Sequence, residues 1–255
     1  MSAPSPTVAP VDFLLRLADD RLVLGHRLSE WCGHAPILEE DIALANIALD
    51  LIGQATALLD LAAAREGAGR TADDLAFLRD ARDYRNLQLA ELPNGDFAVT
   101  IVRQFLFDAW DQLLLDALSR GADAGLAGIA GKAVKESRYH LRHSAEWVVK
   151  LGDGTAESHA RAQAALDERW RFTGEPFLAD DVDRAMAAAG VAPDPATLRE
   201  PWLARVREVV EAATLRLPDD RSVARGGRQG LHTEHLGHML AEMQSVARAH
   251  PGADW

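Results

Sequence analysis

Polar side chains at helical spacing inside apolar segments are the residues of this sequence best placed to do chemistry. Asn46, Asp50 and Gln54 recur at every fourth position of ALANIALDLIGQATALL, which puts them on one face of a helix. Asp108 interrupts the apolar run FLFDAW, one turn after Gln104. An unpaired carboxylate in an apolar core is strongly unfavourable, so we expect these carboxylates to have partners.

Two kinds of partner would satisfy them. Four-helix bundles hold two iron or manganese ions with one Glu from each of two helices and a Glu-x-x-His motif from each of the other two. The second solution is a buried salt-bridge network, for which KAVKESRYHLRH supplies Lys135, Arg138 and Arg142 beside His140. Spacing alone favours the salt-bridge network, because the tetrapeptides that occupy the expected places, ESRY and LIGQ, do not complete the metal motif.

The C-terminal region holds a second cluster of candidate ligands. His232, His235 and His238 lie in GLHTEHLGHMLAEM, where His235 and His238 share a helix face and have the spacing to bind a divalent ion. The segment lacks HExxH, so surface or packing roles are favoured. The preceding Arg225–Gly230 segment, RGGRQG, matches neither phosphate-binding glycine motif and is interpreted as a loop.

Helical periodicity and helix stop signals predict the elements that position these residues. The sequence shows no two-residue alternation and no βαβ rhythm, so we expect an all-α protein with a helical-bundle core. Short linkers favour one domain over residues 11–255, after a flexible Pro/Ser-rich tail at residues 1–10. The expected helices are 11–31, 38–66, 71–78, 80–92, 97–119, 126–151, 155–172, 181–189, 201–217 and 232–249.

The composition is that of an ordinary globular protein, with 48% hydrophobic and 26% charged residues in a chain of 255. A net charge of −12 argues against partners such as nucleic acid or an anionic membrane surface. No uninterrupted apolar run approaches the roughly 20 residues of a membrane span, and the N-terminus lacks the pattern of a secretory signal. The single Cys excludes a disulfide scaffold and fits a reducing cytoplasm.

Long blocks of the sequence resemble those of a known protein family. The chain is similar, from the first helix to Trp255, to the PaaC family of non-catalytic, ferritin-like subunits of the multicomponent phenylacetyl-CoA 1,2-epoxidase. The blocks are LGHRLSEWCGHAP, ALANIALDLIGQA, AELPNGDFAVTIVRQFLFDAW, KESRYHLRHSAEW and GLHTEHLGHMLAEMQ. The resemblance implies a ferritin-like four-helix-bundle core with additional short helices. It also implies a part in phenylacetate catabolism, in an enzyme that epoxidises the aromatic ring with O2 and electrons from a separate NADPH-dependent reductase.

The resemblance also implies where a metal site has been lost. The catalytic subunit of this enzyme is a distant relative that carries two irons, and its ligand pattern can be laid on this chain. The corresponding positions are Glu30, Asp50, Leu51, Gln54, Asp108, Ser137 and His140. Leu51 and Ser137 stand where that pattern has Glu, and Gln54 stands where it has His. The resemblance therefore implies no catalytic, cofactor-binding or metal-binding residue in this chain.

The function expected from the resemblance is support of the catalytic di-iron subunit within the epoxidase, where the other subunits and the reductase are further partners. The isolated chain is expected to be able to form a homodimer. In place of the lost metal, we expect Asp50 and Asp108 to lie in the bundle interior beside His140 and a cation, with Lys135, Arg138 and Arg142 as candidates. Two alternatives stay open, a self-contained di-metal ferritin-like oxidase and a helical binding module without an enzyme partner.

Overall fold

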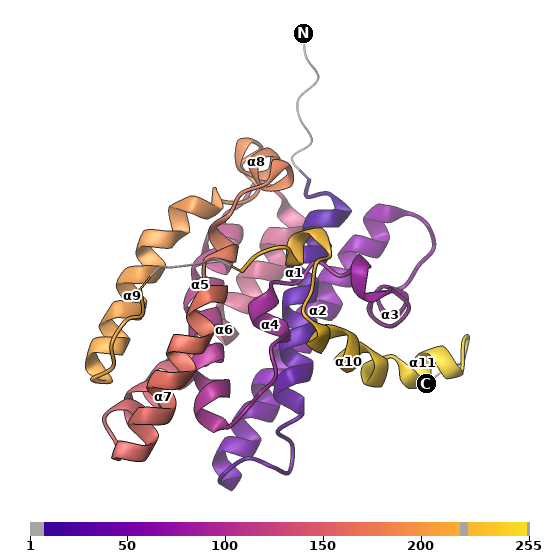
Figure 1. Cartoon of the computed structure of the whole chain (residues 1–255). Coiled ribbons are helices and arrows are strands. Elements are labelled where there is room, and N and C mark those ends of the chain that lie inside the picture. Colours follow the sequence, from indigo (N-terminus) through magenta and orange to yellow (C-terminus); the bar gives the residue numbers. More distant parts are fainter. Residues whose placement is uncertain (1–7, 220–223, 254–255) are drawn as a thin grey trace. The chain divides into compact units, whose positions relative to one another are not determined.

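The computed structural model of the chain describes residues 8–219 and 224–253 (Figure 1). Every regular element in these ranges is an α-helix or a short 3₁₀-helix, which confirms the all-α prediction. The helices form two compact units. The α1–α2 unit comprises Pro10–Pro93 and Arg225–Trp255, and the α5–α6 unit comprises Met1–Ala9 and Asn94–Ala224.

The prediction of a single domain over residues 11–255 stays a prediction. Residues 1–7 of the predicted tail lie outside the described ranges. Pro10 is the N-cap of the first helix, as the sequence indicated.

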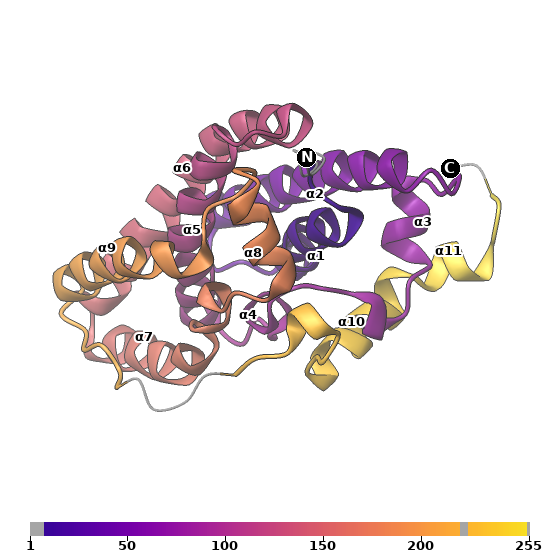
Figure 2. The ribbon, with the colours of Figure 1, turned by 90° about the horizontal axis from the view of Figure 1, so that it is seen from above.

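A hairpin of two long helices forms the core of the α1–α2 unit. Helix α1 (Val11–Ser29) packs along α2 (Leu38–Glu66), and Figure 2 shows the two side by side. Gly25 permits this close approach, because a Cβ there would lie 2.9 Å from Ile52 Cγ1 and 3.2 Å from the Ala48 carbonyl oxygen. Helix α2 ends at Gly67, whose left-handed conformation (φ 66°) suits glycine.

Shorter elements complete this unit. Thr71 and Asp74 form the expected capping box at the start of α3 (Ala72–Phe77). The remaining elements are η1 (Ala81–Asp83), α4 (Gln88–Glu91), η5 (Gly227–Gln229), α10 (Glu234–Met243) and α11 (Ser245–Ala249). The predicted C-terminal helix over 232–249 is thus two helices that meet at Gln244.

The prediction of one continuous helix over 80–92 is wrong, because only its two ends, η1 and α4, are helical. Buried carboxylates of α1 accept hydrogen bonds from backbone N–H groups of this segment, from Arg85 to Asp19 Oδ2 at 2.8 Å and from Leu87 to Asp20 Oδ1 at 2.7 Å. Because these N–H groups bond to another element, they are withdrawn from any local helical ladder. The segment therefore runs extended between η1 and α4.

The α5–α6 unit is built around a second hairpin. Helix α5 (Phe97–Leu118), capped by Asp96, is buried over most of its surface by α6 (Ala124–Gly152), α7 (Ala156–Arg169) and α9 (Arg199–Ala212). Helix α8 (Asp181–Ala188) and the turns η2 (Trp170–Phe172), η3 (Glu175–Phe177) and η4 (Pro195–Leu198) connect them. Helix α9 begins at Arg199 rather than at the predicted Pro201, since η4 leads directly into it.

Each unit thus supplies one hairpin of long helices, the two halves that a ferritin-like four-helix bundle requires. Helix α2 is also long and apolar enough to cross a membrane by length and composition alone, with a mean hydropathy of 1.7 over its most apolar 18 residues. Of that window, 44% is buried inside the molecule, and the core helix of a soluble protein passes the same test.

Candidate functional site

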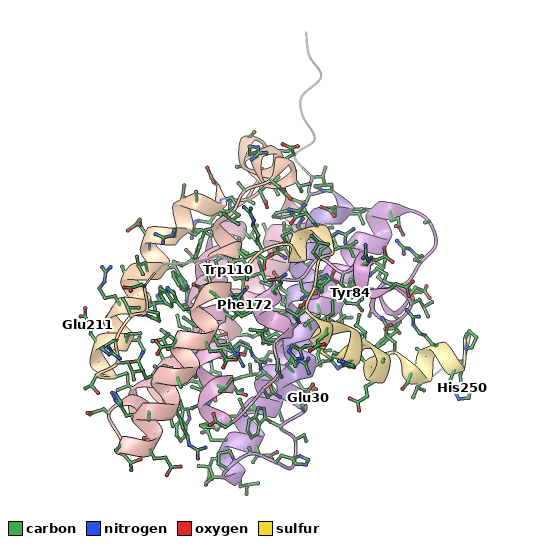
Figure 3. The ribbon with its side chains drawn as sticks, in the orientation of Figure 1. Glu30, Tyr84, Trp110, Phe172, Glu211 and His250 are labelled. Carbon is green, nitrogen blue, oxygen red and sulfur yellow. The ribbon has the colours of Figure 1, made fainter. Side chains whose placement is uncertain are left out.

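Four of the positions that the resemblance assigns to a lost metal site lie in the α1–α2 unit. Leu51 is buried and apolar, and Asp50 is half-buried on the preceding residue of α2. Glu30 directly follows α1 and is labelled in Figure 3. Its carboxylate is partly exposed and accepts a hydrogen bond from Arg27 Nη1 at 2.7 Å. Only two of these four side chains, Asp50 and Glu30, therefore offer a carboxylate.

Gln54 has a cation as its partner. The side chain of Gln54 is buried, and its Oε1 accepts a hydrogen bond from Arg21 Nε at 3.0 Å. Arg21 is itself buried, and its Nη1 donates to the Leu17 carbonyl oxygen at 2.8 Å. A buried guanidinium thus lies beside the position to which the resemblance assigns a His ligand, where its positive charge would repel a metal cation.

In the α5–α6 unit, Asp108 has neutral partners. Its carboxylate is buried and accepts hydrogen bonds from Gln104 Nε2 and Ser144 Oγ, both at 2.7 Å. Burial raises the pKa of Asp108 well above its usual value, against these two hydrogen bonds, and the charge of Asp111 adds to the rise. Asp108 is therefore held by donors that suit its neutral form as well as its ionised form.

This arrangement corrects the prediction that a cation pairs with Asp108. Lys135, Arg138 and Arg142 lie toward the outer side of α6, away from Ser137 and His140, which are buried. The physical reason is that a buried carboxylate can be stabilised by protonation and by neutral donors, without the cost of burying a second charge.

The donor set does not fit a pair of iron ions. Ser137 Oγ is buried and has no hydrogen-bond partner among the residues described, so a neutral hydroxyl stands at one ligand position. Leu51 offers no donor atom, Gln54 is committed to Arg21, and Asp108 carries a raised pKa. Within residues 8–219 and 224–253, no three His, Cys, Asp or Glu side chains gather as a metal site.

A buried charged cluster that the sequence interpretation missed holds the α1–α2 unit together. Asp19 pairs with Arg79 through two hydrogen bonds, and Asp20 pairs with Arg228 through two more, at 3.0 and 2.8 Å. Both carboxylates are completely buried. The sequence signal for this cluster was LADDRLVL, in which three consecutive charged residues lie inside an apolar helix. Charges that are buried in this way need partners from other elements.

The Arg225–Gly230 loop and His232 belong to the same cluster. A Cβ at Gly227 would lie 2.1 Å from the Asn86 carbonyl oxygen, and one at Gly230 would lie 2.3 Å from that of Arg82. The two glycines thus let the loop pack on the 82–88 backbone, and Arg228 then reaches Asp20. The RGGRQG segment is an intramolecular clamp, which explains its glycines and its second Arg without a phosphate ligand.

His232 completes this clamp. Its Nδ1 lies 2.7 Å from Glu91 Oε2 and its Nε2 lies 3.0 Å from the carbonyl oxygen of Tyr84, a residue labelled in Figure 3. Glu91 also accepts from the Thr233 N–H at 2.5 Å. With an acceptor at each ring nitrogen, the doubly protonated imidazole is favoured. His235 contributes its carbonyl oxygen to Arg27 at 3.0 Å, and His238 is exposed.

The other notable surface is an exposed apolar face of α2. Leu38, Ile42 and Leu49 are 72, 53 and 67% exposed. Their spacing of i, i+4 and i+11 places them on one face, and Ile37 extends that face at the N-cap. We call these four side chains the α2 apolar face. Contiguous exposed apolar patches of this kind mark interaction sites.

The fold defines an all-α, ferritin-like protein, and the positions that the resemblance assigns to a metal site hold an incomplete set of ligands. The chain belongs to the phenylacetic acid catabolic protein family, whose model matches residues 2–255. Over 243 residues it is 52% identical to the subunit designated C of the 1,2-phenylacetyl-CoA epoxidase of Escherichia coli (strain K12), and the match covers 95% of this chain and 98% of that protein. These comparisons confirm the family that the sequence blocks indicated.

Proposed function

We propose that this chain is the structural, non-catalytic subunit of a cytoplasmic phenylacetyl-CoA epoxidase, in which it pairs with and stabilises a di-iron catalytic subunit. The strongest support is the hydrogen bond from Arg21 to Gln54 in a member of this family. A buried cation that occupies a ligand position is compatible with a supporting subunit and opposes a metal centre in this chain. The iron cofactor, O2 and the acyl-CoA ring then belong to the partner.

The α2 apolar face is the surface that we assign to this pairing. Two related subunits of ferritin-like fold can pack helix to helix over a large apolar interface. Glu39 and Asp60 are exposed on the same helix, so a two-fold contact between copies of this chain would bring like charges together. A partner with an apolar face and a less acidic margin fits better, and a homodimer is expected to be the weaker assembly, formed when the catalytic subunit is absent.

Co-expression with the catalytic subunit tests this role. We expect a stable complex by size-exclusion chromatography, and a catalytic subunit that is poorly soluble or inactive on phenylacetyl-CoA without this chain. Leu49→Glu should weaken the complex at least roughly 30-fold, the loss typical of a central interface side chain. Leu178→Glu, at a residue 47% exposed in the other unit, is the matched control and should bind like wild type.

The rival function, a self-contained di-metal oxidase, is separated by elemental analysis of the chain purified alone. We expect iron far below one equivalent, because Leu51 and Ser137 supply neither of the Glu ligands. About two irons per chain, as in the di-iron bundles, would favour the rival. A fully active catalytic subunit without this chain would leave the binding-module alternative.

A further inference from the structure

Helix α6 carries a basic face on an acidic protein. All three lysines of the chain, Lys132, Lys135 and Lys150, lie on this helix, although the net charge is −12. Lys132, Lys135, Arg138 and Arg142 lie on the part of α6 that is open to solvent, and at 100° per residue they lie with Tyr139 within one side of the helix. We call these five side chains the α6 basic face.

None of the four cations of this face has an anionic partner among the described residues, whereas some other exposed arginines do. Arg120 pairs with Asp116 at 2.8 Å, and Arg184 pairs with Asp181 at 2.6 Å. Over residues 8–219 and 224–253, Lys132, Lys135, Arg138 and Arg142 enter no ion pair within 4.0 Å. A chain with excess carboxylates thus leaves four neighbouring cations unneutralised, which creates a local positive potential.

An exposed aromatic side chain lies in the middle of this potential. Tyr139 is 42% exposed, its ring stacks on His143 with centroids 6.3 Å apart, and the Arg142 guanidinium lies 5.5 Å from its centroid. These neighbours limit the rotamers of Tyr139, so little side-chain entropy remains to be lost on binding. An aromatic anchor with Arg beside it is the composition typical of protein interfaces.

We propose that the α6 basic face docks an acidic surface of another protein component of the epoxidase, distinct from the subunit on the α2 apolar face. This inference rests on the proposed function. Charge complementarity selects the occupant: four cations over about 15 Å of helix match an acidic helix or loop and promote fast, salt-sensitive association.

Other occupants fit less well. A two-fold contact with a second copy would set this basic face against itself, and a head-to-tail contact with an acidic region of the next copy would form a ring or an open chain of copies rather than a pair. A small anion needs a concave site, whereas this face is the outer side of a helix. Nucleic acid and anionic membranes would be repelled by the rest of a chain of net charge −12.

The test uses the complex of this chain with its catalytic subunit. Each other purified component of the epoxidase, including the reductase, is passed over the immobilised complex, and association rates are measured at several salt concentrations. We expect one component to bind, with a rate that falls steeply as the Debye length shrinks from about 10 Å at 0.1 M to about 3 Å at 1 M salt. The variant Lys132→Gln/Lys135→Gln/Arg138→Gln/Arg142→Gln should associate at least ~10-fold more slowly at low salt, and Tyr139→Ala should speed dissociation at every salt concentration.

The matched control removes four charges elsewhere in the α5–α6 unit, in the variant Arg120→Gln/Arg171→Gln/Arg184→Gln/Arg207→Gln, and should bind nearly as wild type. Equal loss in both variants, or no loss in the first, would overturn the proposal. Binding of duplex DNA or of anionic phosphatidylserine vesicles that only the α6 variant loses would also overturn it. If the chain fails to pair with its catalytic subunit at all, the proposed function fails first, whereas an intact complex with an unaffected α6 variant refutes only this inference.

Discussion

Removal of the Arg228 side chain should unfold the α1–α2 unit at much lower denaturant. The guanidinium donates two hydrogen bonds to the Asp20 carboxylate, at 3.0 and 2.8 Å, and others to the carbonyl oxygens of Arg85 at 2.7 Å and Arg16 at 3.2 Å. Arg228→Ala breaks all four bonds and leaves Asp20, which is completely buried, with the Leu87 N–H as its remaining donor among these contacts.

The expected loss in free energy of unfolding follows from the Asp20 carboxylate, which stays buried without its cation. Breaking a buried ion pair from one side costs about 3–5 kcal/mol, equivalent to roughly 6–20 °C in Tm for a chain of this size. Asp20→Asn should cost less, since the amide oxygen still accepts from Leu87 N–H and Arg228 keeps its two carbonyl partners and some access to solvent. The two substitutions together should therefore cost less than the sum of the two.

The assay is urea unfolding, monitored by circular dichroism, of wild type, Arg228→Ala, Asp20→Asn and the double variant. Arg184→Ala is the matched control, because its partner Asp181 is fully exposed and an exposed pair contributes about 0–1 kcal/mol. A free energy of unfolding for Arg228→Ala within about 0.5 kcal/mol of wild type, the usual scatter of surface substitutions, would refute the assignment of Arg228 as a clamp.

Three further predictions address single groups. Burial alone would lower the pKa of His232, but the hydrogen bond and charge of Glu91 raise it. This stabilisation is therefore complete below about pH 6.5 and is lost as the pH rises through the folded-state pKa, so the melting advantage of wild type over His232→Gln should shrink with rising pH. Burial raises the pKa of Asp108, so its ionised form opposes folding, and Asp108→Asn should melt no lower than wild type at neutral pH. Asp108→Ala leaves Gln104 and Ser144 without their acceptor and should cost about 1–3 kcal/mol in urea unfolding. Gly227→Ala places a Cβ 2.1 Å from the Asn86 carbonyl oxygen and should cost about 1–3 kcal/mol by overpacking, with faster proteolysis of the C-terminal segment.

For each of these three residues, one result would contradict the prediction. Parallel pH profiles for wild type and His232→Gln would remove His232 from the clamp. An Asp108→Asn variant that melts well below wild type would mean that a charged Asp108 stabilises the fold. Gly128→Ala is the control for Gly227→Ala, because a Cβ there meets no atom within 4 Å, and a helical Ala is favoured over Gly by up to about 1 kcal/mol. Equal stability of the two variants would contradict the close packing of the loop.

The sequence determined most of the helices and the types of side chain at the positions that the resemblance assigns to a metal site. Helix periodicity and the Thr71 capping box predicted α1, α2 and α3 because these signals act within a few residues of the chain. At two of those positions, Leu51 and Ser137 supply no carboxylate. No tertiary information was needed for either conclusion.

Only the tertiary structure decided how the buried charges are paired. The partner of Asp20 lies 208 residues away at Arg228, and Glu91 meets His232 across 141 residues. Periodicity placed Lys135, Arg138 and Arg142 near His140 along the helix, but it did not show on which face each would lie, and Asp108 is satisfied instead by Gln104 and Ser144. A hydrogen bond between distant segments depends on where those segments dock, and docking is set by the packing of the whole unit, which no local pattern encodes.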